Sequence, residues 1–174
     1  MIGQIFFGYF GGMILLTSLL VISRKNPVHS VLWMLVMFFH IAGLYLFLNA
    51  EFMAAVQIIV YAGAILVLFL FVLFLLNLKS EPKEKQFVGG WPLGFTAALA
   101  ILLLIMIPLM KMQVKADGPW SIEAVTKTTH TVAVGTVLYT EYLLPFEVTS
   151  LILLVAIVGA VMLAKGGLRE KEEE

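Results

Sequence analysis

The amino-acid sequence predicts an all-α integral membrane protein with five transmembrane helices. Hydrophobic residues make up 61% of the chain and charged residues only 13%, whereas soluble domains carry roughly 45–50% apolar and about 25% charged residues. The mean hydropathy of +1.04 agrees with this excess. Because 174 residues of this composition cannot cover themselves with polar surface, we expect a lipid bilayer around most of the chain.

The charge balance and the cysteine count exclude several classes of function. The formal net charge is zero, which gives no indication of a nucleic-acid partner. The chain has no cysteine, which excludes disulfides, thiol chemistry and iron–sulfur ligation by its own side chains. Arg24 and Lys25 follow the first apolar run instead of preceding it. We therefore interpret this run as a retained helix and not as a cleaved signal peptide.

The first two spans are separated by a short polar turn. A span needs about 20 mostly apolar residues, and the first is expected over residues 2–22, before the polar cluster 23–26. The second is expected over residues 28–48. Asn26 is the expected N-cap of this helix and Pro27 its first helical residue.

The third span, expected over residues 52–76, is the longest. Only residues 49–51 separate it from the second, so the two helices are expected to form a tight antiparallel pair. At 1.5 Å per residue it would reach about 37 Å, which exceeds about 30 Å of hydrocarbon, so it must tilt or be locally distorted. Gly63 also weakens helix regularity. An extra residue held as a π-bulge would satisfy both facts, and such bulges are frequent at functional sites.

The fourth span, expected over residues 92–110, follows the charged stretch 79–85, which is expected to be a solvated loop. Trp91 and Pro92 open the span, and Trp is typical of the headgroup region. Residues 111–142 form a long polar outer loop. Its β-branched part, from Thr128 to Thr140, is compatible with a strand, a helix or irregular structure.

The fifth span is expected over residues 145–163. Residues 1–164 then form a single transmembrane domain, and residues 165–174 form a charged cytoplasmic tail.

The distribution of basic residues predicts the topology. The segments after the first, third and fifth spans hold eight of the 11 basic residues: Arg24, Lys25, Lys79, Lys83, Lys85, Lys165, Arg169 and Lys171. The other three, Lys111, Lys115 and Lys127, all lie in the long loop. The positive-inside rule therefore places the C-terminus in the cytoplasm and the N-terminus outside.

The histidines do not suggest a cofactor site. A haem held between two helices needs two imidazoles at matching depth, and of His29, His40 and His130 only His40 lies deep in a predicted span. No nucleotide-binding fingerprint is present. We expect no catalytic residue, no metal site and no bound cofactor on this chain, and no catalysis by the isolated chain.

The deep spans hold too few ionisable groups for a complete proton path. Buried ionisable residues in a membrane are costly and usually functional. Here only His40 and Tyr61 are titratable at depth. Gln57, Asn77 and Thr17 are the polar residues that accompany them. These groups are sufficient for one wall of a path whose other walls belong to partner subunits.

Several residues have two open interpretations. Glu51 is expected in the first turn of the third helix, and Glu147 lies two residues after Pro145 in the expected first turn of the fifth. Each carboxylate either stabilises the positive helix end, or relays protons at the outer interface or pairs with a neighbouring subunit. His40 is either such a group or a histidine hydrogen-bonded within a helix contact.

The segment 60–65 also has two interpretations. Its Gly and Ala residues are typical of a face for close helix contact in lipid, in which case Tyr61 is a buried aromatic with a satisfied hydroxyl. The alternative is a switchable helix centred on Tyr61 and Gly63.

Residues 57–65, followed by 67–72, resemble the third helix of the family formed by subunit J of bacterial NADH:quinone oxidoreductase (respiratory complex I) and its mitochondrial counterpart, chain 6. Residues 144–147, leading into 151–160, are a second similarity, and residues 26–30 are a third. The number of spans, the long loop after the fourth span and the total length agree, so the resemblance covers nearly the whole chain. His40 is not a position associated with the family.

The resemblance implies a subunit of the membrane arm, in the bacterial cytoplasmic (inner) membrane, with other membrane-arm subunits as partners. In this family the third helix is thought to change between a π-bulged and a regular form around the positions of Tyr61 and Gly63. That change is linked to a hydrated connection toward the proton-pumping subunits. FMN, iron–sulfur clusters and quinone are expected in partner subunits.

The function expected from the sequence is therefore coupling of NADH-to-quinone electron transfer to proton translocation, with Tyr61 and Gly63 at the coupling element and Glu51 and Glu147 as further candidates. Three alternatives remain: the equivalent subunit of a membrane-bound hydrogenase or cation antiporter, a free-standing small transporter, and a purely structural helix spacer. Neighbouring genes would test the first and transport by the purified chain in liposomes the second.

Overall fold

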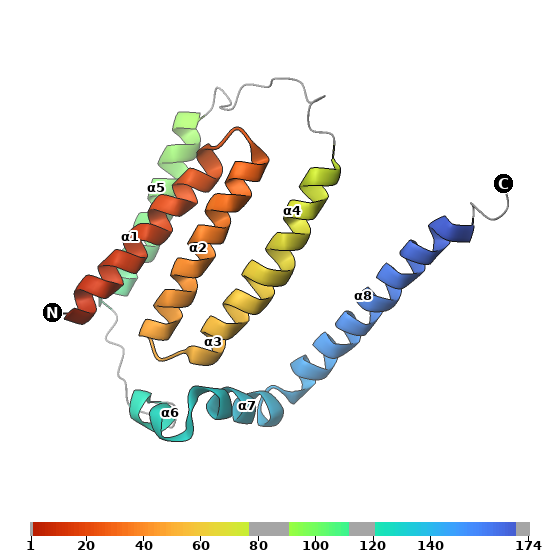
Figure 1. Cartoon of the computed structure of the whole chain (residues 1–174). Helices are drawn as coiled ribbons and strands as arrows, with labels where there is room; N and C mark the ends of the chain where they lie inside the picture. Colours follow the sequence, from red (N-terminus) through yellow and green to blue (C-terminus); the bar gives the residue numbers. More distant parts are fainter. Residues whose placement is uncertain (1, 77–90, 112–120, 170–174) are drawn as a thin grey trace. The chain divides into compact units, whose positions relative to one another are not determined.

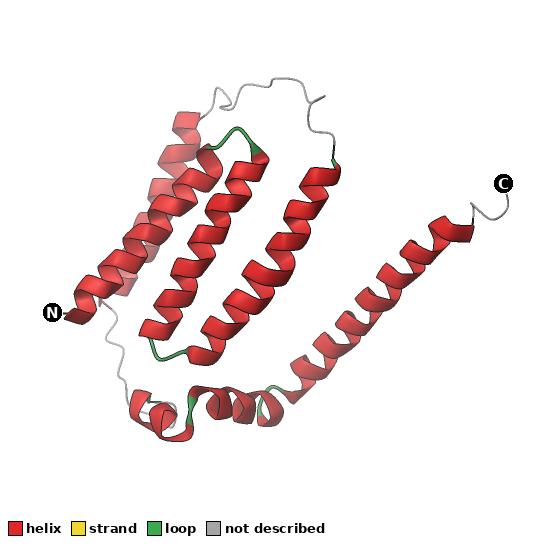
Figure 2. Ribbon diagram, viewed as in Figure 1, coloured by secondary structure: helices red, strands yellow, loops and turns green. Residues whose placement is uncertain are grey.

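The computed structural model describes residues 2–76, 91–111 and 121–169. Within these ranges the regular structure is helical and no strand is present (Figure 2). Five of the helices are long and apolar enough to cross a membrane: Ile2–Ser23, Pro27–Phe47, Glu51–Leu75, Pro92–Met110 and Leu143–Lys165. The predicted all-α membrane protein with five spans is thereby confirmed, and the spans begin and end within two residues of their predicted bounds.

The chain divides into two compact units, Met1–Ile122 and Glu123–Glu174, which are described separately. The helices of the first unit are α1 (Ile2–Ser23), α2 (Pro27–Phe47), the third span formed by α3 (Glu51–Val56), the π-helical segment η1 (Gln57–Ile65) and α4 (Leu66–Leu75), and α5 (Trp91–Lys111). Figure 1 shows α1, α2 and the third span side by side, with α2 in contact with both neighbours.

Small residues allow α1 and α2 to approach closely. Thr17 of α1 is fully buried, and Val31 and Ala42 of α2 are each 2% exposed. A Cβ added to Gly43 would lie 2.5 Å from Cε1 of Phe10, so the Phe10 ring occupies the space that a side chain at position 43 would need. This is the packing expected in lipid, where close contact between small residues replaces hydrophobic burial as the force between helices.

Both ends of α2 are capped by local hydrogen bonds. The Asn26 side chain accepts a hydrogen bond of 2.9 Å from the Val28 N–H, and Pro27 is the first helical residue, as predicted. At the other end Asn49 has a φ of 58°, a left-handed conformation that Asn tolerates. The Ala50 N–H bonds to the Tyr45 carbonyl at 2.8 Å, which is the six-residue bond of a Schellman motif. This motif produces the predicted tight turn into α3.

The α5 helix begins at Trp91, as predicted, and continues through Pro108 to Lys111. The interpretation of residues 79–85 as a solvated loop, and any role for Asn77, lie outside the described residues.

The second unit contains α6 (Ile122–Thr128), α7 (His130–Thr140) and α8 (Leu143–Arg169). Residues 128–140, left open by the sequence, are therefore largely helical. Thr129, with a φ of 69°, separates α6 from α7. The Tyr139 ring packs edge-on against Phe146, with 5.0 Å between ring centroids, and joins α7 to α8.

Apolar side chains cover the surfaces of α5 and α8. Neither predicted span contains a buried residue within its apolar window, and Met110 and Leu163 are 82% and 83% exposed. A helix that is apolar on all sides requires lipid or other apolar helices around it. The orientation of the termini, the single domain over residues 1–164 and the cytoplasmic tail over 165–174 stay predictions.

We predict that Gly43→Leu lowers the free energy of unfolding of the purified chain by about 1–3 kcal/mol, because the Phe10 ring must leave its place. Gly12→Leu is the matched control, since an added Cβ at position 12 meets nothing within 4 Å. Denaturant titration in detergent, followed by the loss of helical circular dichroism, measures the difference. Equal stabilities of the two variants would contradict the close α1–α2 contact.

Candidate functional site

The third span contains a π-helical segment of nine residues, Gln57–Ile65. At its end the Leu66 N–H bonds to the Tyr61 carbonyl, five residues earlier, whereas the bond of an α-helix spans four residues. The predicted distortion around residues 60–65 is confirmed, and it also includes the residues from Gln57 to Ile59.

The residues buried on the third span show how the π turn changes its register. The buried side chains are Ala54, Gln57, Ala62 and Leu66, exposed by 2%, 7%, 5% and 3%. Their spacing is three, five and four residues. One face of a regular α-helix carries residues spaced by three or four, so the five-residue step marks the extra residue. With the regular spacing, Tyr61 would be on the buried face; the π turn puts Ala62 there instead.

Tyr61 consequently lies at the edge of the contact with α2. Its side chain is 45% exposed, and its ring packs edge-on against Phe38 of α2, with 6.0 Å between centroids and 76° between planes. No hydrogen-bond partner of its hydroxyl is found among the described residues. In the chain alone, Tyr61 is therefore neither buried nor hydrogen-bonded to a described residue. The hydroxyl is free to bind water or a neighbouring subunit.

Gly63 is the residue that makes the wide turn sterically easy. A Cβ added at position 63 would lie 3.2 Å from the Ile58 carbonyl oxygen, five residues earlier. The obstacle is backbone, which cannot rotate away as a side chain can. Glycine therefore fits the π form without a shift, and any larger residue strains it.

Gln57 is the buried polar residue of this segment, and it was not among the predicted site residues. Its side chain is 7% exposed at the first position of η1, and burying an amide in an apolar surrounding is costly unless it is hydrogen-bonded. The feature of the sequence that could have indicated Gln57 is its position four residues before a tyrosine in an otherwise apolar span.

His40 and Thr17 are satisfied within their own helices. The His40 Nδ1–H donates to the Val36 carbonyl at 2.8 Å, and the Tyr9 and Phe10 rings lie 6.0 and 6.4 Å from the imidazole. The Thr17 hydroxyl donates to the Met13 carbonyl at 2.7 Å. These contacts favour the interpretation of His40 as a histidine held within a helix contact.

The two glutamates have different surroundings. Glu51 is exposed at the first position of α3, where its charge favours the helix N-terminus, and ten residues separate it from Tyr61, about 15 Å along a helix. Glu147 belongs to the second unit. Its expected place in a first helical turn is wrong, because α8 begins at Leu143 and carries no acidic residue in its first turn.

The structure thus brings two of the four candidates, Tyr61 and Gly63, into one π segment. Glu51 begins the same continuous helix, and Glu147 is described only within its own unit. No group of three or more His, Asp or Glu side chains that could hold a metal occurs among the described residues. His29 and His40 lie on one helix, about 16 Å apart along its axis. The expectation that this chain binds no cofactor stays a prediction.

These features define a multi-pass helical membrane protein whose third span carries a π segment with a tyrosine and a glycine. Residues 17–163 match the protein family described as NADH-ubiquinone/plastoquinone oxidoreductase chain 6. The chain belongs to this family.

Its similarity to individual relatives extends over most of its length. It is 38% identical over 159 residues to NADH-quinone oxidoreductase subunit J of Rhodobacter capsulatus, covering 90% of this chain and 79% of the relative. It is 37% identical over 161 residues to subunit J of Rickettsia conorii, covering 91% and 78%. It is also 37% identical over 188 residues to NADH-ubiquinone oxidoreductase chain 6 of Prototheca wickerhamii, covering 97% and 90%.

We predict that Gly63→Ala shifts the third span toward the regular helix. In the π form an alanine Cβ at position 63 would lie 3.2 Å from the Ile58 carbonyl oxygen, whereas alanine is the residue that a regular helix accommodates best. Because the tight α2–α3 turn holds α3, the residues that follow the wide turn, Ala62 among them, rotate and Ala62 leaves the buried face.

The natural chain has no cysteine, so Ala62→Cys reports this rotation through its rate of maleimide labelling. We expect the rate to rise several-fold when Gly63→Ala is added and to stay unchanged when Gly12→Ala is added, since position 12 is open space. An unchanged rate in both backgrounds would contradict the role of Gly63.

Proposed function

We propose that this chain is a membrane-arm subunit of an NADH:quinone oxidoreductase (respiratory complex I) of the bacterial cytoplasmic (inner) membrane. There it couples electron transfer from NADH to quinone to proton translocation. Membership of the chain 6 family and the names of the bacterial relatives support the assignment. Five apolar spans support the multi-pass membrane location.

The observation that carries the coupling role is the register around Tyr61. In the π form Ala62 faces α2 and Tyr61 is 45% exposed. If the wide turn tightened to a regular α-helical turn, the following residues would rotate by about 100° about the helix axis. Tyr61 would then move to the α2 face. The tyrosine hydroxyl would then be presented to two different surroundings. A water chain that includes it would be completed in one form and interrupted in the other.

The electron carriers belong, in this proposal, to partner subunits. The chain contains no cysteine for iron–sulfur ligation, and its histidines His29 and His40 are separated along one helix. FMN, iron–sulfur clusters and quinone are therefore assigned to other chains, and the isolated chain is not catalytic.

The apolar surfaces supply the contacts that such an assembly needs. The exposed sides of α5 and α8 fit neighbouring membrane-arm subunits and lipid, because a polar environment would leave these surfaces hydrated at high cost.

We predict that Gly63→Leu lowers quinone reduction and proton pumping at least several-fold in the assembled complex, because its Cβ, 3.2 Å from the Ile58 carbonyl oxygen, strains the π form. Oxidation of NADH with an artificial acceptor should persist, since it does not require the membrane arm. Pumping is measured in proteoliposomes by the quenching of a pH-sensitive dye.

Tyr61→Phe provides the chemical control, because it keeps the ring against Phe38 and removes only the hydroxyl. It should lower pumping while the labelling rate at position 62 is unchanged. Wild-type turnover and pumping in both variants would identify the chain as a structural spacer.

A further inference from the structure

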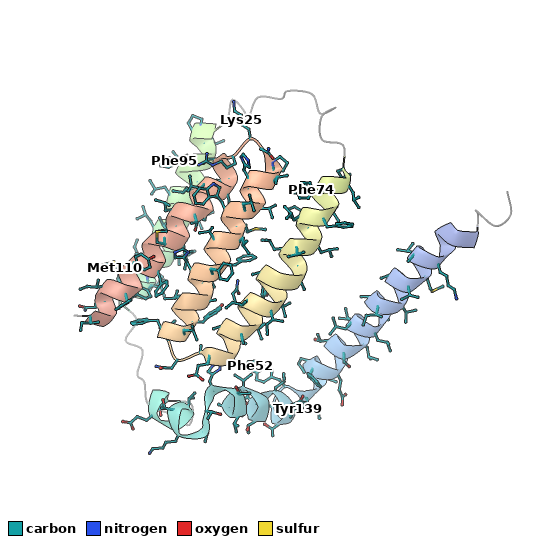
Figure 3. The ribbon with its side chains drawn as sticks, viewed as in Figure 1. Lys25, Phe52, Phe74, Phe95, Met110 and Tyr139 are labelled. Carbon is teal, nitrogen blue, oxygen red and sulfur yellow. The ribbon has the colours of Figure 1, made fainter. Side chains whose placement is uncertain are left out.

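A pocket at the α1–α2 turn has no role in the proposed coupling. Its volume is about 410 Å³, and its polar wall is formed by Arg24, Lys25 and Ser30. Both basic side chains are exposed, and Lys25 extends from the connection between α1 and α2 (Figure 3). The pocket therefore presents two cations and a hydroxyl side by side.

The rest of the wall is apolar and comes from three helices. Ile22 of α1, Val31 and Met34 of α2, and Phe69 of α4 line it. Ile22 and Phe69 are 75% and 47% exposed, so the pocket opens toward the outer surface of these helices. A ligand bound here would contact positive charge at one end and hydrocarbon at the other.

Arg24 is held in place by an aromatic ring. Its guanidinium carbon lies 5.7 Å from the centroid of the Trp33 ring, within the range of a cation–π contact. Tryptophan is typical of the headgroup region of a membrane. We therefore expect Arg24 at the depth of lipid phosphates, with its guanidinium restrained by the Trp33 ring.

The charges of the pocket are not neutralised by the surrounding described residues. Glu51 is the one carboxylate among the described residues of the first unit, and it lies at the α2–α3 turn, at the other end of α2. The negative end of α1 and the positive end of α2 meet at this turn and largely offset each other. Among the described residues of this unit, the net charge at the pocket is therefore that of the Arg24 and Lys25 side chains.

We propose that this pocket binds an anionic phospholipid, with its phosphate between Arg24 and Lys25 and an acyl chain along Ile22, Met34 and Phe69. Basic residues after a span are expected from membrane topology alone, but topology requires neither the pocket nor the ring beneath Arg24. The apolar wall distinguishes a lipid from free phosphate as the ligand. Basic pockets between membrane helices are known to take such headgroups.

The test uses the full chain purified in detergent and native mass spectrometry, which counts bound lipids. The probes are dioleoyl phosphatidylglycerol and dioleoyl phosphatidylcholine, which share their acyl chains and differ in headgroup charge. We expect R24Q/K25Q to bind phosphatidylglycerol about 25-fold more weakly, since each basic residue near anionic lipid contributes about fivefold. The control K127Q/K165Q removes two exposed charges outside the pocket and should bind as the unchanged chain does.

Ser30→Phe obstructs the pocket and keeps both charges. It should weaken phosphatidylglycerol binding about tenfold, and its helical circular dichroism should match that of the unchanged chain. Full binding by this variant would mean that surface charge alone attracts the lipid and would overturn the pocket. Equal binding of the two lipids to the unchanged chain, or displacement of phosphatidylglycerol by an equal concentration of inorganic phosphate, would also overturn the proposal.

Discussion

The hydrogen bond from the Leu66 N–H to the Tyr61 carbonyl belongs to the π turn that sets the register of the later part of the third span relative to α3. In hydrocarbon every backbone N–H and C=O needs a partner within the structure, because no water is present to replace it. A π turn adds one residue to a helix while keeping the backbone paired within the same segment. A kink or a broken helix would instead expose unpaired groups at bilayer depth. The exposure of Tyr61, the burial of Ala62 and the need for Gly63 all follow from this turn.

The two ends of the third span respond differently to a change of register. The Schellman turn at Asn49 and Ala50 ties α3 closely to α2, so α3 resists rotation about its axis. The α4 helix is apolar on all sides, and Val67, Leu68 and Phe71 are exposed by 56%, 63% and 59%. Any of these side chains can face lipid at similar free energy, so rotation of α4 costs little in solvation. The third span is thus fixed to α2 at its start, whereas its end can rotate about the helix axis at little cost in free energy.

The sequence predicted the spans, the Asn26 cap and the π segment because each depends on local chemistry. Span bounds follow from hydropathy, and the segment was indicated by an excess of length together with Gly63. The helix α7 was not predictable from its β-branched composition. Its threonines are compatible with a helix because their hydroxyls bond back four residues, as Thr136 does to Val132 at 2.8 Å and Thr140 to Thr136 at 2.7 Å.

The start of α8 and the extent of η1 could not be predicted for other reasons. Pro145 is the third residue of α8, and a proline is tolerated anywhere in a first turn because those N–H groups have no helical partner. Its position therefore allows several helix starts, and the start at Leu143 moved Glu147 out of the first turn. The extent of η1 depends on which residues pack against α2, and that contact is a property of two helices together.

The buried core of the chain is small, and this restricts what the chain can do alone. Among the described residues, the buried apolar ones are Val31, Ala42, Ala54, Ala62, Leu66 and Ala133. Four of the six are alanines, which bring helices close without burying much area. Such contacts hold α1, α2 and the third span together and leave the outer side of Tyr61 uncovered. Because the described deep helices offer few polar groups to continue a path from that hydroxyl, a proton route through it requires groups from neighbouring chains. In the proposed coupling, the register of η1 decides whether those groups and the hydroxyl are connected, and the role proposed for the chain is to position one group in a path that it does not complete.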